Sequence, residues 1–107
     1  KRQIKNYSKN IPIHITENGM ANRDRVIRGI VNDNARINYY KLHLEKIKEL
    51  IDEKAPIKSY FAWSLLDNFE WAFGYNKRFG LVHVDFNTQK RLPKSSYYAF
   101  QKALNAR

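Results

Sequence analysis

The sequence predicts an α/β fold in which two consecutive β/α units form part of a larger parallel sheet. The expected elements follow the order strand, loop, helix, strand, long loop, helix, as in a parallel sheet with helices outside it. The strands are mostly apolar, which is typical of strands covered on both faces. Because two strands alone cannot make such a sheet, we expect the chain to be part of a barrel or of a doubly wound sheet.

The first unit contains a short strand and a long amphipathic helix. β-branched residues predict the strand at about 12–17, and the turn signal Glu17-Asn18-Gly19 ends it. The helix is predicted at about 33–54, after the N-cap candidates Asn32-Asp33-Asn34 and before Pro56. Its apolar face recurs at spacings of three and four and comprises Ile37, Tyr40, Leu44, Ile47 and Ile51.

The second unit begins with an apolar run without clean alternation, which predicts a buried strand at about 57–66. A short β element is predicted at about 79–86, before a turn. A terminal helix is predicted at about 95–106, with Ser95 or Ser96 as its cap.

Composition excludes several classes of protein. The chain has no cysteine, so it carries no disulfide and no thiolate chemistry, and we expect a cytoplasmic location. No stretch approaches the ~20 apolar residues of a membrane span. The net charge of +10 comes from scattered basic residues without a long run, which indicates a solvated surface rather than a nucleic-acid or membrane partner. The polar segment 1–10 is interpreted as the tail of a helix, and because Lys1 is not preceded by a methionine we expect a fragment or a processed chain.

The stretch from Trp63 to Trp71 contains the densest group of candidate ligand-binding side chains in the sequence. It places two tryptophans and two carboxylates within nine residues, at the end of an apolar run. A sugar ring suits such a surface, because its C–H face stacks on indole and its hydroxyls donate to a carboxylate. Glu17 follows the other strand, and catalytic side chains of parallel β/α folds gather where strands end.

Several motifs at matching spacing resemble the C-terminal part of family 1 glycoside hydrolases, the β-glucosidase family. The resemblance extends from about Pro12 to Ala99. It includes Thr16-Glu17-Asn18-Gly19, Asp33, Arg36, Tyr39, His43-Leu44, the stretch from Trp63 to Trp71, Gly74-Tyr75, Arg78-Phe79-Gly80-Leu81-Val82 and Val84-Asp85. It implies that the chain forms the last two β/α units of a (β/α)8 TIM barrel and is incomplete on its own.

The resemblance also implies a role for each site residue. Glu17 resembles the nucleophile of a retaining mechanism, which forms a glycosyl-enzyme intermediate. Glu70 resembles the carboxylate that accepts hydrogen bonds from O4 and O6 of the sugar, and Trp71 the donor to O3. Trp63 resembles the platform beneath the ring, and Phe79 an aromatic wall near O6 that could equally fill the end of the barrel. The same pattern implies a cis peptide bond after Trp63.

The expected function is retaining hydrolysis of β-glycosidic bonds in neutral β-glucosides, with β-galactosides and β-fucosides left open. The expectation of neutral substrates rests on Glu70. Family members that take 6-phosphorylated sugars replace this carboxylate, which would repel a phosphate. The alternative is a non-catalytic basic module that binds carbohydrate or nucleic acid.

The sequence contains only part of an active site. A retaining mechanism needs a second carboxyl group as acid/base, which the family carries in an N-E-P motif on an earlier strand, and this chain has no N-E-P. We therefore expect the remaining N-terminal portion of the barrel as a partner, and an inactive segment without it. We expect no cofactor and no metal, because His14, His43 and His83 share no ligand motif.

Overall fold

A parallel β/α/β unit forms the first half of the chain in the computed structural model, which describes residues 11–106. Strands β1 (Ile13–Asn18) and β2 (Ile57–Ala62) pair in parallel, and helix α2 (Asn34–Asp52) connects them. A helical crossover is the usual connection between parallel neighbours. The segment 1–10, interpreted above as the tail of a helix, lies outside the described residues.

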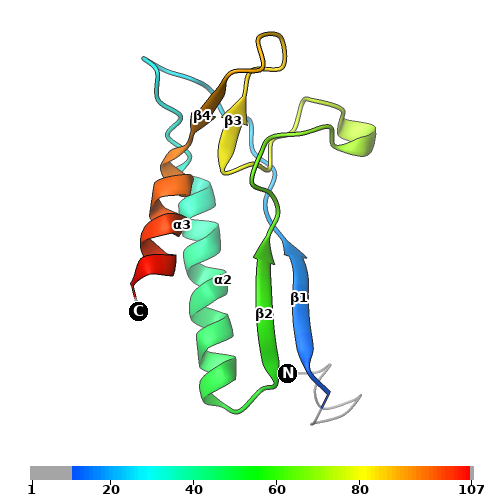
Figure 1. Ribbon diagram of the computed structural model, residues 1–107, viewed down its shortest axis with the longest axis vertical. Helices are drawn as coiled ribbons and strands as arrows, with labels where there is room; N and C mark the ends of the chain where they lie inside the picture. The colour runs from blue at the N-terminus through cyan, green and yellow to red at the C-terminus, as the bar shows by residue number, and fades with distance from the viewer. Residues whose placement is uncertain (1–10, 107) are drawn as a thin grey trace.

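A hairpin and a second helix follow. The loop after β2 contains the short 3-10 helix η1 (Trp71–Phe73) and leads to β3 (Val82–Val84). Strand β3 pairs antiparallel with β4 (Arg91–Pro93), and helix α3 (Ser95–Asn105) comes next. Figure 1 shows that η1, the hairpin and the loops after both parallel strands lie beyond the same strand ends.

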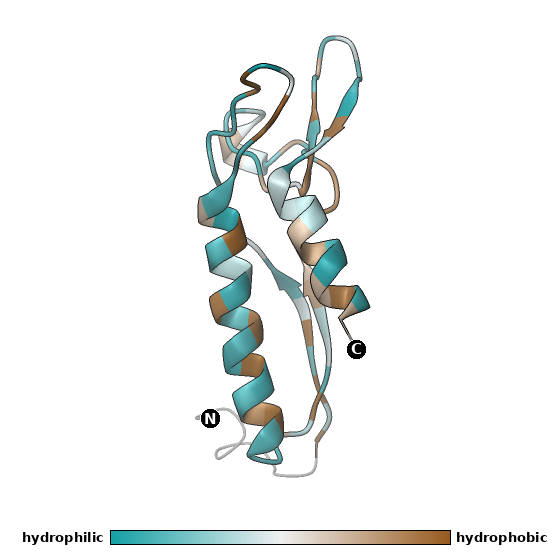
Figure 2. Ribbon diagram, turned by 90° about the vertical axis from the view of Figure 1, so that its left-hand side faces the viewer, coloured by the Kyte–Doolittle hydropathy of each residue, from teal (hydrophilic) through white to brown (hydrophobic). Residues whose placement is uncertain are grey.

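Both helices lie on the β2 side of the strand pair. Helix α2 packs against α3 and against β2, and Figure 2 shows the two helices side by side with the strands behind them. The hydrophobic bands of α2 interrupt a largely hydrophilic surface, as its spacing of apolar residues predicts.

The second parallel strand ends at Ala62, short of the predicted range of about 57–66, because the backbone changes partner after Trp63. The Ser64 amide donates to the Phe79 carbonyl (3.2 Å). The Leu81 amide then donates to the Ser64 carbonyl (2.9 Å). The chain thus leaves β1 and pairs with the segment that leads into β3.

The β element predicted at about 79–86 forms a strand only over Val82–Val84, and its partner Arg91–Pro93 was not predicted. That partner has three residues and contains a proline, which cannot donate to a strand ladder. Neither its length nor its composition signals a strand.

The described residues bury little apolar surface. Five apolar side chains are buried, namely Val31, Tyr40, Leu81, Val82 and Val84, whereas seven buried residues are polar or charged. The radius of gyration is 16.0 Å, compared with about 13 Å for a compact domain of this length. The fold therefore has the elements of a β/α sheet without the core of a complete one.

Candidate active site

Glu17 lies at the end of β1, beside the start of the loop that follows β2. Asn18 pairs with Ala62, and the Trp63 amide donates to the Asn18 carbonyl (2.7 Å). The parallel register therefore brings Glu17 and Trp63 to neighbouring strand ends. The Glu17 side chain is exposed, and no hydrogen bond or ion pair within residues 11–106 engages its carboxylate. It is thus available to an incoming group.

Trp63 and Glu70 meet directly. The indole Nε1 of Trp63 donates to Oε1 of Glu70 (3.3 Å), and the Glu70 residue is only 8% exposed. Trp63 remains partly exposed, so the pair offers an apolar plate and a carboxylate on one surface. The loop thus joins two of the predicted site residues that are seven apart in the sequence.

Trp71 and Phe79 are placed differently. Trp71 is 87% exposed and adopts a left-handed backbone conformation (φ 46°) at the start of η1. So large an exposed indole is unusual and suits contact with a ligand or a partner. Phe79 is half-buried, and its recorded hydrogen bond is through the backbone, to Ser64. No hydrogen bond or ring contact among the described residues joins either side chain to Glu17 or to Trp63.

The backbone at Trp63 is held from two sides. The peptide bond between Trp63 and Ser64 is cis, as the resemblance implies. The Tyr40 hydroxyl, on α2, donates to the Trp63 carbonyl (3.0 Å). On the other side a Cβ atom at Gly19 would lie 1.9 Å from the same carbonyl oxygen, so only glycine fits there. The loop start is therefore fixed against both α2 and the end of β1.

A cluster of six buried or nearly buried charged side chains anchors the loops beneath the site. Its members are Asp24, Asp33, Arg36, Asp67, Arg78 and Lys94. Lys94 Nζ lies between Asp24 Oδ2 (2.5 Å) and Asp67 Oδ1 (2.8 Å), and all three side chains are fully buried. Asp67 also binds Arg78 (2.6 Å) and accepts a hydrogen bond from the Gly80 amide (3.0 Å). The loop that carries Trp63 and Glu70 is thus tied to the loop after β1 and to the start of α3.

Arg36 extends this cluster into α2. Its guanidinium pairs with Asp24 (2.8 Å) and with Asp33, and donates to the Arg78 carbonyl (2.8 Å). Burial alone would raise the pKa of Asp24, but its bonds with Arg36 and Lys94 outweigh this and hold the pKa below its ordinary value. Desolvation would likewise lower the pKa of Arg36, and the two carboxylates raise it instead. Both shifts favour the charged forms of Asp24 and Arg36.

Sequence reasoning missed most of this cluster. Asp67 pairs within the loop between β2 and β3, with Arg78 and the Gly80 amide, but its further bond with Lys94 joins residues 27 apart and was not predicted. The N-cap prediction for Asp33 holds for its position, but its side chain does not cap α2 and instead accepts from the amide and hydroxyl of Ser96 in the first turn of α3. Single charged residues in polar loops carry no local signal of burial, and only Arg36 stands on a helix with apolar periodicity.

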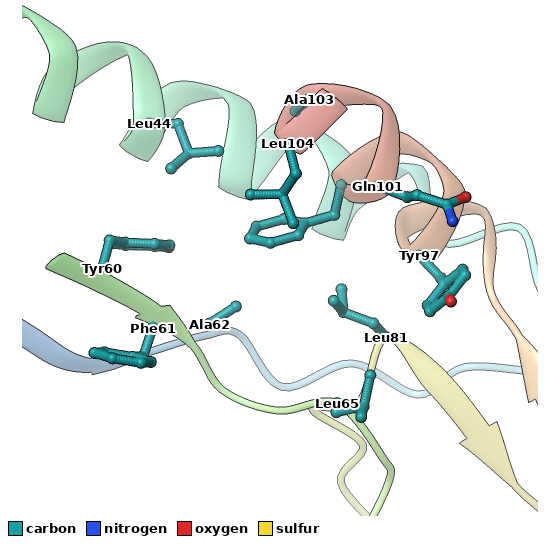
Figure 3. A pocket seen from close by; sticks show the side chains of 11 residues that line it. Leu44, Tyr60, Phe61, Ala62, Leu65, Leu81, Tyr97, Gln101, Ala103 and Leu104 are labelled. Carbon is teal, nitrogen blue, oxygen red and sulfur yellow. The ribbon is translucent and has the colours of Figure 1, made fainter. Parts of the chain in front are cut away.

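The groove of about 620 Å³ between α2, α3 and β2 contains none of the predicted site residues. Figure 3 shows its lining, which is mostly apolar and includes Phe61, Leu65 and Leu104. These three side chains are exposed. The groove is thus open apolar surface of the sheet and helix layer, distinct from the carboxylate-bearing strand ends.

Within the described range, no group of three or more His, Asp or Glu side chains could hold a metal ion. None of the helices in that range combines the length and apolar character that a membrane span needs.

The chain thus places an exposed carboxylate at one strand end beside a tryptophan–glutamate pair at the next, where active sites of β/α barrels lie. The family model for glycosyl hydrolase family 1 matches residues 2–107, and the chain belongs to this family. The expected partial (β/α)8 barrel is thereby confirmed.

Relatives of this chain are several times longer. A 6-phospho-beta-galactosidase of Streptococcus mutans is 48% identical over 95% of this chain and 21% of its own. A bifunctional beta-D-glucosidase/beta-D-fucosidase of Bifidobacterium breve is 51% identical over 81% of this chain and 20% of its own. The family 1 β-glucosidase structure from Thermotoga maritima has a TM-score of 0.93 and 47% identity over 98% of this chain and 24% of its own. The chain therefore spans about a fifth of the length of the curated relatives it matches.

The cluster can be tested in a completed enzyme, in which this chain replaces the segment of the Thermotoga maritima β-glucosidase that it matches. We expect Lys94→Met to lower the free energy of unfolding by about 3–5 kcal/mol, because it leaves Asp24 and Asp67 buried with one cation fewer. Urea unfolding measures this. The matched control is Lys48→Met, whose exposed pair with Asp52 should matter little. Equal losses in the two variants would contradict the anchoring role.

The close approach of Gly19 to Trp63 predicts a second effect. We expect Gly19→Ala in the completed enzyme to cost about 1–3 kcal/mol and to change the near-ultraviolet circular dichroism, because the Trp63 carbonyl must move. Gly29→Ala is the control, since its φ of 76° is unfavourable for alanine but no atom lies within 4 Å. It should destabilise without altering the aromatic signal. An unchanged spectrum for Gly19→Ala would show that the carbonyl is not confined.

Proposed function

We propose that this chain supplies the nucleophile and part of the sugar-binding subsite of a retaining β-glycosidase that acts on neutral β-glucosides. The observation that carries the proposal is the exposed, unengaged carboxylate of Glu17 at a strand end beside the Trp63–Glu70 pair. Family membership makes glycoside chemistry the reaction to test.

In the proposed mechanism Glu17 attacks the anomeric carbon, the leaving group departs, and water then releases the sugar from the glycosyl-enzyme. Such a mechanism needs an acid/base carboxyl group about 5–5.5 Å from the nucleophile. The N-E-P motif that carries this group in the family is absent from the chain. The remaining portion of the barrel is therefore the proposed partner, and we propose that it also covers the apolar groove beside β2.

The sugar would be held by the loop after β2. We propose that Trp63 forms the platform beneath the ring, while Glu70 accepts hydrogen bonds from O4 and O6. The hydrogen bond from Trp63 orients the Glu70 carboxylate and leaves acceptor capacity for a ligand, because each carboxylate oxygen accepts more than one bond. Trp71 as the donor to O3 and Phe79 as a wall near O6 complete the proposal.

The relatives include a 6-phospho-beta-galactosidase and a beta-D-glucosidase/beta-D-fucosidase, and we base the choice between these two substrate classes on Glu70. At O6 of the sugar, a buried carboxylate would accept a hydrogen bond from a hydroxyl group. It would repel a phosphate group, which carries negative charge of its own. We therefore propose neutral glycosides.

The nucleophile assignment is tested by Glu17→Gln in the completed enzyme. We expect turnover of an aryl β-glucoside to fall on the order of 10⁴-fold or more, with calorimetric binding of the substrate largely retained. Glu45→Gln, on the exposed face of α2, is the control and should keep full turnover. The 107-residue chain alone should show no turnover. Undiminished activity of Glu17→Gln would remove the assignment.

The substrate class is tested with a matched pair of aryl glycosides, one neutral and one 6-phosphorylated. We expect the completed enzyme to prefer the neutral glycoside, and Glu70→Gln to lower its kcat/KM by about 10- to 100-fold, because a charge-assisted hydrogen bond is lost. Glu49→Gln serves as the control, since this carboxylate pairs with Lys46 on the exposed face of α2. Activity on the 6-phosphoglycoside with none on the neutral analogue would refute the proposal.

A further inference from the structure

We propose that Tyr40 is a positioning residue of this site: its hydroxyl, by holding the Trp63 carbonyl, fixes the Trp63–Glu70 pair relative to Glu17. The inference rests on the proposed function and deepens it. Tyr40 itself lies in the helix layer, so it would act through Trp63 and without touching the sugar.

Tyr40 is a buried residue whose hydroxyl donates a hydrogen bond to the Trp63 carbonyl. The residue is 3% exposed, and its hydroxyl lies 3.0 Å from the Trp63 carbonyl oxygen. Its ring packs edge-on against Phe100 of α3 (5.5 Å between centroids), which limits its movement. Burial raises the pKa of Tyr40 to about 12, so the phenol keeps its proton throughout the neutral range.

The Trp63 carbonyl is confined, so that a shift of this group would be transmitted to the end of β1. The Trp63 carbonyl lies against Gly19, and the Trp63 amide donates to the Asn18 carbonyl (2.7 Å). These two residues follow Glu17 directly in the chain. Movement of the Trp63 backbone therefore changes the spacing between the indole and the end of β1 that carries Glu17.

Movement of the Trp63 backbone would also affect Glu70, because the Trp63 indole is hydrogen-bonded to the Glu70 carboxylate. The Trp63–Glu70 hydrogen bond is already long at 3.3 Å, so a small displacement of the ring weakens it. Removing the Tyr40 hydroxyl leaves the Trp63 carbonyl without this donor, and the backbone must relax toward another one. Substrates that use the Glu70 contact most should then lose most.

The experiment compares Tyr40→Phe with its parent in the completed enzyme, using an aryl β-glucoside and an aryl β-xyloside, which lacks the C6 hydroxymethyl group. Rates are expressed per active site titrated with a slow-releasing glycoside, so poor folding lowers the amount of enzyme and not the constants. We expect kcat/KM for the glucoside to fall about tenfold, the effect of one hydrogen bond, and for the xyloside to fall less than about threefold. Tyr98→Phe, an exposed tyrosine on α3, is the control and should change neither.

A double variant completes the test. If Tyr40 acts through Trp63, adding Tyr40→Phe to Trp63→Phe should have almost no further effect on the glucoside. Equal losses for both substrates, or an undiminished effect in the Trp63→Phe background, would overturn the inference. A parent enzyme that cleaves neither glycoside would instead mean that the proposed function itself has failed.

Discussion

The structure depends on the buried charges around Lys94. A buried ion pair contributes little net stability compared with apolar packing, but removing one partner strands the other in a medium that cannot solvate it. Lys94 sits between Asp24 and Asp67, which belong to the loops after β1 and β2. The two loops can therefore not separate without exposing or stranding these charges. That constraint sets where the site lies.

The cluster also explains how short segments hold a defined geometry. Asp67 accepts from the Gly80 amide and binds Arg78, whose backbone pairs with Asn22 in an isolated bridge. A Cβ at Gly80 would lie 2.2 Å from the Asp67 amide, so this approach also requires glycine. The loop that carries Trp63 and Glu70 is thus held by backbone contacts at both of its ends.

Local patterns predicted the parts of this fold that are governed by local physics. The spacing of Ile37, Tyr40 and Leu44 predicted the long helix, and the β-branched run before Glu17 predicted the first strand. The resemblance placed Trp63 and Glu70 in one site, and the structure joins them by a hydrogen bond. The long-range contacts of the site could not be predicted from local sequence patterns. The pairing of Asp67 with Lys94 and the donation from Tyr40 to Trp63 depend on segments 27 and 23 residues apart, and neither leaves a periodic signal.

The buried charge cluster and the apolar groove beside β2 differ in whether the chain itself covers their side chains. In the buried cluster the charges are paired within the chain, since three carboxylates face three cations, so the cluster contributes nothing to the net charge of +10. Beside β2 the apolar side chains of Phe61 and Leu65 remain exposed, and within residues 11–106 only five apolar side chains are buried. The carboxylate-bearing strand ends are therefore organised by contacts within this chain, whereas the groove beside β2 leaves apolar side chains that these contacts do not cover. A completed barrel should consequently change the stability of these loops far more than it changes their geometry.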